Sequence, residues 1–450
     1  MSKNTLLRRS FLAGSLGALG AAGISSFQVR AMTPAKSRPR SPNDRLNIAA
    51  IGVGGKGFSD VMTCDTENIT ALCDVDWNSA ADAFNRFPHA KRYKDFRKML
   101  EECKEIEAVT ISTPDHFHAI AAIRCMEMGK HVYVQKPLSH TVHEARMLRE
   151  TAHRYGVATQ MGNQGAATVQ HRELCEMIWA SLIGQVREVH SWTDRPQGWW
   201  PQGIPSPLPE QPVPNTLDWN LWLASAPYRP YNSGYCPFKW RGWWDFGTGA
   251  LGDMGAHLMD QPFWALDLGH PKTIQASSTK FTKDSYPVAE TVTYEFPARG
   301  KFAPTRLTWY DGGLTPTRPK ELENGRMMGD EGGGVLIVGK KGSLMCGTYG
   351  ENPRLLPEKL MQDYKRPAKS IPRSPGIHEE WIAAIKEGKK STTDFSYSAT
   401  LTEVMLLGNI AMRTAETKTV LEWDPIKMEF PNLPEANQYL HKQYRQGWSL

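Results

Sequence analysis

The stretch from Leu46 to Asp74 constrains the fold of this chain more than any other. It contains a short apolar run, the glycine pattern Gly52-x-Gly54-x-x-Gly57, a helical stretch, and a second apolar run that ends at Asp74. This order of strand, glycine turn, helix, strand and acid is the fingerprint of a dinucleotide-binding βαβ unit. The alternative interpretation is a glycine-rich turn that binds nothing.

Each part of the fingerprint has a physical role. Gly52 permits the tight turn, Gly54 lets the backbone approach a pyrophosphate, and Gly57 allows the helix to pack closely on the strand. The pyrophosphate charge meets free N–H groups at the helix N-terminus. Asp74 lies 20 residues after Gly54, where its carboxylate can accept hydrogen bonds from ribose hydroxyls and repels a 2′-phosphate. Asp76 follows with no Arg or Lys between, so we expect NAD in preference to NADP.

Strand-like and helical stretches alternate over residues 44–135. This alternation predicts a right-handed, doubly wound parallel sheet, on which ligands bind at the carboxyl ends of the strands. A further strand ends at the loop 162–165, so we expect Asn163 and Gln164 to line the same cleft. The other residues expected at strand ends in this cleft are Gly52, Asp74, Thr113, Pro114 and Lys136.

The second part of the chain has a different pattern. The expected strands lie at 273–281, 290–296, 305–310, 335–339 and 343–346, and the expected helices at 251–267, 377–387 and 397–415. They predict an α+β domain with a mainly antiparallel sheet. A length of 450 residues agrees with two domains. The predicted organisation is a Rossmann domain over 44–162, a substrate-binding and oligomerisation domain over 163–430, and a tail over 431–450.

Residues 1–31 have the pattern of a targeting segment and are set aside from fold reasoning. The twin-arginine pattern RRSFL at 8–12 precedes a weakly apolar run rich in Gly and Ala, and VRA at 29–31 offers a small-residue cleavage site. The run is too short and too rich in glycine for a transmembrane helix. We expect export to the periplasm by the twin-arginine route, with 32–43 as a linker and no stable membrane insertion. The alternative is a basic N-terminal segment without this role.

Composition narrows the class of function. The net charge of +6 is modest and partly reflects the N-terminal segment, so it gives no case for nucleic-acid binding. The seven cysteines are scattered, odd in number and without a CxxC pair, which indicates neither a disulfide framework nor a zinc site. The 15 tryptophans are more unusual, because several of them cluster.

Three side chains are candidates for proton transfer. Lys136 ends a predicted strand, where its ammonium can hydrogen-bond a substrate hydroxyl beside the cofactor; the alternative is a solvated lysine. Asp253 and His257 are four residues apart and share one helix face. Histidine titrates near neutrality and can take a proton from an alcohol as the hydride leaves. The alternatives are a surface Asp–His pair and a metal site, for which a third ligand is missing.

Tryptophans and charged residues lie close together in the second part of the sequence. Flat indole faces beside fixed charged donors suit a sugar, whose C–H faces stack while its hydroxyls form hydrogen bonds. The alternative is a tryptophan-rich core or an oligomer interface. The candidate substrate-binding residues of this cluster are Trp192, Arg195, Trp240, Arg241 and Trp243.

Together these motifs resemble the Gfo/Idh/MocA family of oxidoreductases, many of which act on sugars and inositols. The resemblance covers roughly residues 44–415 and rests on motifs that fall in family order: the glycine fingerprint, Asp74, Ser112-Thr113-Pro114 with His118, Lys136-Pro137, and Asp253 with His257. It implies an NAD cofactor contacted by Thr113, Pro114, His118 and Lys136. It also implies an open C-terminal sheet that forms the substrate site and the interface of a homo-oligomer, a dimer or tetramer.

The resemblance also implies a catalytic Lys136, with Asp253 and His257 completing the proton-handling group and Asp253 touching the substrate. Gln135 stands where the family commonly has glutamate, so a charge beside Lys136 is absent. Certain exported relatives resemble glycosidases that oxidise a sugar hydroxyl, eliminate the aglycone, add water and reduce the sugar again. The hypotheses are therefore net oxidation of a sugar or polyol by NAD, redox-neutral glycoside cleavage, and non-catalytic sugar binding.

Overall fold

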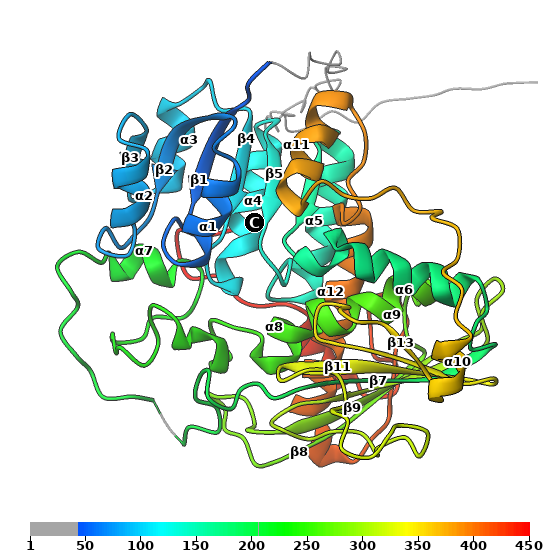
Figure 1. The fold of residues 1–450 in the computed structure, drawn as a ribbon. Coiled ribbons are helices and arrows are strands. Elements are labelled where there is room, and N and C mark those ends of the chain that lie inside the picture. The colour runs from blue at the N-terminus through cyan, green and yellow to red at the C-terminus, as the bar shows by residue number, and fades with distance from the viewer. Residues whose placement is uncertain (1–43, 206) are drawn as a thin grey trace, which may run out of the picture. The chain divides into compact units, whose positions relative to one another are not determined.

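A computed structural model describes residues 44–205 and 207–450, which contain two β-sheets (Figure 1). The first sheet has six parallel strands in the order β3-β2-β1-β4-β5-β6. This arrangement confirms the predicted N-terminal Rossmann fold. The strands are β1 (Asn47–Ile51), β2 (Asn68–Cys73), β3 (Lys91–Tyr93), β4 (Ala108–Ile111), β5 (His131–Val134) and β6 (Thr159–Met161), and the helices between them are α1 (Lys56–Thr63), α2 (Ala81–Arg86), α3 (Phe96–Glu102), α4 (Asp115–Glu127) and α5 (Val142–Tyr155).

The central strands of this sheet are continuous apolar runs, as expected where helices cover both faces of a parallel sheet. Every residue of β4 is buried. Helix α5 begins with a capping box between Thr141 and Glu144 and ends at Gly156 in the left-handed conformation. These local signals define both ends of the helix.

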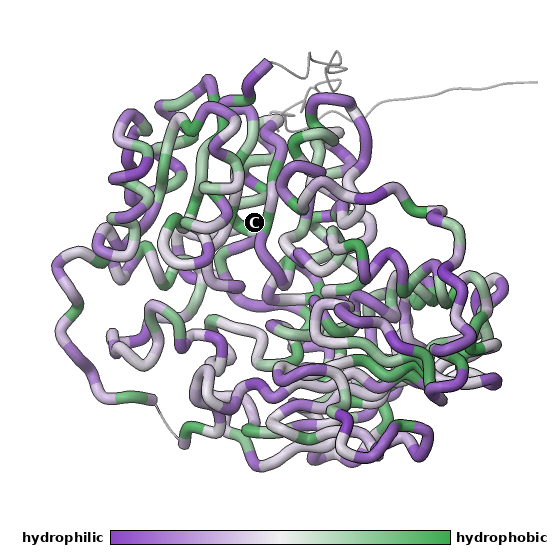
Figure 2. Tube along the Cα trace, in the orientation of Figure 1, coloured by the Kyte–Doolittle hydropathy of each residue, from purple (hydrophilic) through white to green (hydrophobic). Residues whose placement is uncertain are grey.

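The second sheet has eight strands in the order β13-β12-β11-β7-β10-β9-β8-β14. All neighbouring pairs are antiparallel except β7 with β10, which confirms the predicted, mainly antiparallel sheet. Figure 2 shows hydrophobic residues along strands of this sheet and hydrophilic residues on the loops around it. The strands are β7 (Val186–Thr193), β8 (Thr273–Ser278), β9 (Glu290–Phe296), β10 (Thr305–Tyr310), β11 (Gly333–Gly339), β12 (Ser343–Cys346), β13 (Arg354–Leu356) and β14 (Leu421–Glu422).

The remaining helices come from the second part of the chain, and several of them contact strands of the second sheet. They are α6 (Val169–Trp179), α7 (Trp219–Leu223), α8 (Gly249–Leu258), α9 (Asp260–Leu266), α10 (Glu358–Gln362), α11 (Ile377–Glu387) and α12 (Phe395–Arg413). Short 3₁₀ segments occur at Gln164–Ala167, Lys239–Gly242, Ala415–Thr417 and Pro434–Leu440.

The helix predicted over 251–267 is in fact two helices, α8 and α9, separated at Met259. Pro262 has no backbone N–H, so the carbonyl of Leu258 lacks its usual partner within a continuous helix. The hydroxyl of Ser191 in β7 donates to this carbonyl at 3.1 Å instead. The break therefore fastens the end of α8 to the second sheet.

Helix α11 comes from the second part of the sequence but lies against the first sheet. Its Ile377 and Trp381 pack in one buried cluster with Leu46, Ile48 and Tyr133. Figure 1 shows α11 beside β5. The first sheet is thus completed by a segment far away in the chain.

All seven cysteines are buried and free of disulfide bonds. Within the described ranges, no helix combines the length and the apolar character needed to cross a membrane. The predicted targeting segment and linker lie outside the described residues.

Candidate active site

A cavity of about 530 Å³ lies at the carboxyl ends of the parallel strands. Its walls come from both parts of the chain, so residues far apart in the sequence meet there. From the first sheet the structure brings together Gly52, Gly54, Asp74, Thr113, Pro114 and Lys136. From the second part it adds Gln164, Arg195, Trp240, Arg241, Asp253 and His257.

The glycine turn is packed so closely that side chains do not fit. A Cβ atom on Gly57 would lie 1.9 Å from the carbonyl oxygen of Gly52. A Cβ atom on Gly54 would lie 2.1 Å from the hydroxyl of Ser79. Gly52 has a φ of +76°, which favours glycine. The bare backbone of this turn is therefore open to close approach by a pyrophosphate.

Asp74 holds the glycine turn from the end of β2. Its carboxylate accepts hydrogen bonds from the backbone N–H groups of Val53 at 2.8 Å, Gly54 at 3.2 Å and Asp76 at 2.9 Å. Burial raises the pKa of Asp74, and the three donors oppose this shift. The hydroxyl of Thr113 on the same cavity wall is buried without a hydrogen-bond partner among the described residues. A glycine cradle, an acid at the end of β2 and an unsatisfied hydroxyl fit NAD in this cavity.

Lys136, Asp253 and Arg241 form one ionic cluster. The Lys136 ammonium donates to the Asp253 carbonyl at 2.8 Å and to its carboxylate at 2.9 Å. The Arg241 Nε donates to the same carboxylate oxygen at 3.0 Å. Burial alone would raise the pKa of Asp253, but Lys136 and Arg241 outweigh it and hold the pKa well below its usual range. Asp253 therefore supplies the negative charge beside Lys136.

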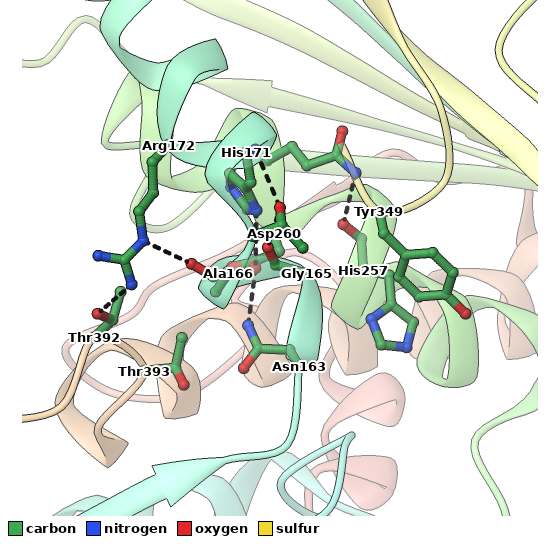
Figure 3. A network of polar contacts seen from close by, with 12 residues as sticks. Asn163, Gly165, Ala166, His171, Arg172, His257, Asp260, Tyr349, Thr392 and Thr393 are labelled. Carbon is green, nitrogen blue, oxygen red and sulfur yellow. Dashed lines mark hydrogen bonds and ion pairs between the residues drawn. The ribbon is translucent and has the colours of Figure 1, made fainter. Parts of the chain in front are cut away.

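His257 lies beside this cluster on α8. Figure 3 shows its imidazole next to the ring of Tyr349, whose centroid is 4.8 Å away in an edge-on arrangement. The Nδ1 atom of His257 has no hydrogen-bond partner within the described part of the chain. Burial, reinforced by the charge of Lys136, lowers the pKa of His257 well below its usual value. The imidazole is thus neutral, and one of its ring nitrogens has no partner in the described residues. No hydrogen bond joins it to Asp253 within residues 44–205 and 207–450, although the two residues are one turn apart on α8.

Gln135 faces an acid from another element. Its side-chain N–H donates to the Asp60 carboxylate at 2.8 Å, and the Ser112 hydroxyl donates to the same oxygen at 2.7 Å. Lys56 forms an ion pair with Asp60, and His378 lies 3.2 Å from it. The carboxylate near this strand end therefore belongs to α1, and an amide at position 135 is its complement.

Gln135→Glu is expected to lower the free energy of unfolding by about 3 kcal/mol, because a second buried carboxylate would face Asp60 without a proton donor between them. Urea denaturation measures the change. The matched control is Asp60→Asn combined with Gln135→Glu, which again places an amide N–H against a carboxylate. Recovery of much of the lost stability in the double variant is expected; a double variant as unstable as the sum of the two single variants would contradict the pairing.

Three predicted substrate residues do not line the cavity. Trp192 faces the side of β7 opposite to Ser191, since side chains alternate along a strand, and packs with Leu336. Trp243 is fully buried, and its indole N–H donates to the carbonyl of Gly234 at 2.9 Å. These two residues therefore belong to a tryptophan-rich core, which is the alternative interpretation of this cluster.

Asn163, the third of these residues, is buried behind the cavity. Its amide donates to the Asp260 carboxylate at 2.9 Å, as Figure 3 shows. His118, expected at the cofactor, is also buried away from the cavity walls. Its two ring nitrogens contact the carbonyls of Pro137 and Thr113, each at 2.8 Å. His118 therefore holds two backbone segments next to cavity residues, whereas Asn163 contacts the carboxylate at the start of α9.

Asp260 provides a pH-dependent contribution to stability. It accepts hydrogen bonds from Asn163 and, at 2.6 Å, from the Tyr397 hydroxyl, and burial raises its pKa from 3.8 to about 7. The folded state therefore holds a proton that the unfolded state releases, and this stabilisation is complete below pH ~4 and lost as the pH rises to ~7.

Asp260→Asn is expected to remove that dependence. The free energy of unfolding of the wild type, minus that of the variant, should fall between pH ~4 and ~7 by at most about 1.4 kcal/mol per pH unit. Above pH ~7 the difference should be level. Urea denaturation across this pH range measures both proteins, and parallel profiles would rule out a raised pKa at Asp260.

Several aromatic residues that line the cavity were not predicted from the sequence as site residues. The Arg195 guanidinium lies 4.0 Å from the centroid of the Trp199 ring, and Arg241 lies 4.3 Å from Phe238. We call this set, with Trp200 and Trp240, the aromatic–arginine wall. Trp199 and Trp200 lie close to Arg195 in the sequence, but Phe238, Tyr349 and Trp448 carry no motif that could have indicated them. In the described residues no group of three or more His, Cys, Asp or Glu side chains is arranged to hold a metal ion.

Two family models match this chain. One, described as the NAD-binding Rossmann fold of an oxidoreductase family, matches residues 46–163. The other, described as the C-terminal alpha/beta domain of the same family, matches residues 197–301. The first match contains the glycine turn, Asp74 and Lys136, and the second contains Arg241, Asp253 and His257.

Curated relatives match parts of the chain. An uncharacterized oxidoreductase of Rhizobium meliloti is 32% identical over 144 residues, which are 32% of this chain and 42% of the relative. A glycosyl hydrolase family 109 protein of a Shewanella species is 34% identical over 172 residues, 33% of this chain and 37% of the relative. The match thus spans well under two thirds of either relative.

A solved structure matches most of the fold. It is the WlbA dehydrogenase from Chromobacterium violaceum in complex with NADH and UDP-GlcNAcA, with a TM-score of 0.61 and 17% identity. The match covers 87% of this chain and 99% of that one. At this identity it shows a shared fold.

Proposed function

The chain belongs to the Gfo/Idh/MocA family of oxidoreductases and carries its NAD-binding Rossmann domain, and from this premise we propose that it transfers a hydride between a carbohydrate or polyol hydroxyl and a tightly held NAD. One observation carries the proposal: a single cavity brings the glycine turn and Asp74 together with Lys136, Asp253 and His257. Acid–base groups beside a dinucleotide site are what alcohol oxidation requires.

In this proposal His257 takes the proton of the reacting hydroxyl at its free ring nitrogen. Lys136 donates a hydrogen bond to the reacting oxygen and stabilises the negative charge that develops there. Asp253 fixes the Lys136 ammonium through its two contacts at 2.8 and 2.9 Å. Bound NAD supplies the hydride-accepting nicotinamide. The glycine turn would hold its pyrophosphate and Asp74 its ribose. The Asp74 carboxylate would repel a 2′-phosphate, which supports NAD over NADP.

The aromatic–arginine wall supports a sugar-like substrate. Indole faces stack on the C–H faces of a sugar ring, and guanidinium groups donate to its hydroxyls. Trp199, Trp200, Trp240 and Phe238 line the cavity with Arg195 and Arg241. The WlbA dehydrogenase of the same fold was solved with a sugar nucleotide.

A second candidate is redox-neutral cleavage of a glycoside, in which NAD is reduced and reoxidised within one cycle. The glycosyl hydrolase family 109 relative from Shewanella favours it. The predicted twin-arginine export favours it as well, since an enzyme outside the cytoplasm needs a cofactor that stays bound. The proposal includes a periplasmic location, which fractionation of the source cells would test. It also includes assembly into a homo-oligomer, which light scattering would test.

One experiment separates the candidates. The nucleotide released from purified protein is identified by mass spectrometry, and the protein is then screened with free sugars, polyols and nitrophenyl glycosides without added NAD. A lasting rise in nicotinamide absorbance with a free sugar supports net oxidation, and repeated release of nitrophenol without such a rise supports glycoside cleavage. Protein that holds no nucleotide and shows no affinity for NAD would contradict both.

A further inference from the structure

A second cavity, of about 240 Å³, shares no lining residue with the active site. It lies where the start of α5 and the end of α12 meet the C-terminal segment 439–443 and Trp244. Neither family model covers this meeting point as a whole, because α5 lies in one matched range and α12 in neither. Its character depends on the charged side chains in its wall.

Arg413, the last residue of α12, is the central group of this wall. Its guanidinium lies 4.4 Å from the centroid of the Trp244 ring and 4.2 Å from that of Tyr439. These cation–π contacts use the faces of the two rings and none of the N–H donors of the guanidinium. Among residues 44–205 and 207–450 no side chain or carbonyl accepts a hydrogen bond from it. Burial lowers the pKa of Arg413, as expected for a cation without a paired anion.

The other charges near the cavity do not neutralise Arg413. Asp245 is the acid on the wall, and its carboxylate is bonded to Arg229 at 2.7 Å. Lys442 adds a positive charge on the wall, and its ammonium is bonded to Glu144 at 2.8 Å. Lys283 adds a further cation. The cavity therefore presents an uncommitted guanidinium in a positive setting, which suits a small anion.

We propose that this cavity binds a small oxyanion, either inorganic phosphate or the carboxylate or phosphate group of a sugar acid or sugar phosphate, through the edge of the Arg413 guanidinium. A guanidinium edge matches two oxygens of such a group in a bidentate hydrogen bond. The volume of about 240 Å³ is large enough for the anion and part of an attached sugar.

The cavity also borders the segment that leads into α8. Asn409 on its wall donates to the carbonyl of Thr248 at 2.9 Å, and His140 contacts the carbonyl of Gly247 at 3.1 Å. The Trp244 ring lies 3.5 Å from that of Tyr286, whose hydroxyl also donates to Gly247. An anion on Arg413 would therefore rest against the residues that position the start of α8.

The test is calorimetric titration of the full chain, saturated with NAD so that its pyrophosphate site is filled. Inorganic phosphate, glucuronate and glucose 6-phosphate are the probes, with sodium chloride keeping the ionic strength constant. Wild type is expected to bind at least one of them saturably. Arg413→Met should weaken that binding about tenfold or more, since a charge-assisted pair is lost. Phosphate binding alone identifies a free-phosphate site, whereas preference for either sugar probe identifies the attached sugar.

Arg187→Met is the matched control, because Arg187 is an exposed arginine on β7 away from both cavities, and its binding should equal that of the wild type. Arg413→Lys keeps the charge without the fork and should bind more weakly than wild type, which keeps the test valid if the methionine variant does not fold. No binding of any probe by the wild type, or equal binding by the Arg413 variants, would overturn the proposal. The measurement does not depend on turnover, so failure of the proposed function leaves its result intact.

Discussion

Lys136→Met is expected to lower the turnover rate about 10³-fold while NAD remains bound, because the variant keeps the length of the side chain but loses the hydrogen bond to the reacting oxygen. The rate is measured with whichever sugar or glycoside the screen identifies, and bound nucleotide is measured by mass spectrometry. The loss should appear mainly in kcat, since the interaction strengthens as charge develops on the oxygen.

The structure supplies a specific reason for this effect. Lys136 is held by the carbonyl and the carboxylate of Asp253, so its ammonium has little freedom to move. Removing it also leaves the buried Asp253 with Arg241 as its remaining partner in this cluster. Lys98→Met, an exposed lysine of α3, is the matched control and should keep wild-type rates. A Lys136→Met enzyme that retains more than about a tenth of the wild-type kcat would exclude a role in chemistry.

Gly57→Ala is expected to lower the free energy of unfolding by about 3 kcal/mol and to abolish measurable NAD binding. The added Cβ would lie 1.9 Å from the backbone carbonyl of Gly52, which cannot move without opening the glycine turn. Opening the turn would also disturb the N–H groups of Val53 and Gly54 that Asp74 holds. Urea denaturation and titration with NAD measure the two effects.

Gly129→Ala separates crowding from backbone strain. Gly129 has a φ of +72°, and no atom lies within 4 Å of a Cβ built on it. Its substitution should therefore cost about 1 kcal/mol of strain and leave NAD binding unchanged. If Gly57→Ala cost no more than Gly129→Ala, the close packing at Gly57 would not be the reason for a glycine there.

The parts of the site that the sequence predicted are those set by local chemistry. Gly52, Gly54 and Asp74 lie within one βαβ unit, and strand ends such as Lys136 meet in any doubly wound sheet. Their positions follow from chain order and right-handed connections. The resemblance to a known family added Asp253 and His257 in the same cavity.

The remaining features depend on contacts between distant segments. Tyr349 reaches His257 from the loop between β12 and β13, and no local pattern marks it. The sequence predicts Trp192 and Trp243 as substrate residues. A tryptophan that packs in a core and one that stacks on a sugar cannot be told apart in the sequence. The acid that complements Gln135 is Asp60, 75 residues earlier, so the effect of the missing glutamate was visible only in the folded chain.

The position of α11 has a consequence for protein engineering. This helix covers the first sheet with Ile377 and Trp381. In the chain, however, it comes after strands β7 to β13 of the second sheet. A fragment cut after β6 would leave Leu46, Ile48 and Tyr133 without that apolar cover. The cofactor-binding part of this protein is therefore not a transferable module in its contiguous form. A chimaera that borrows it must graft residues 377–387 as well, or supply another helix of the same apolar face.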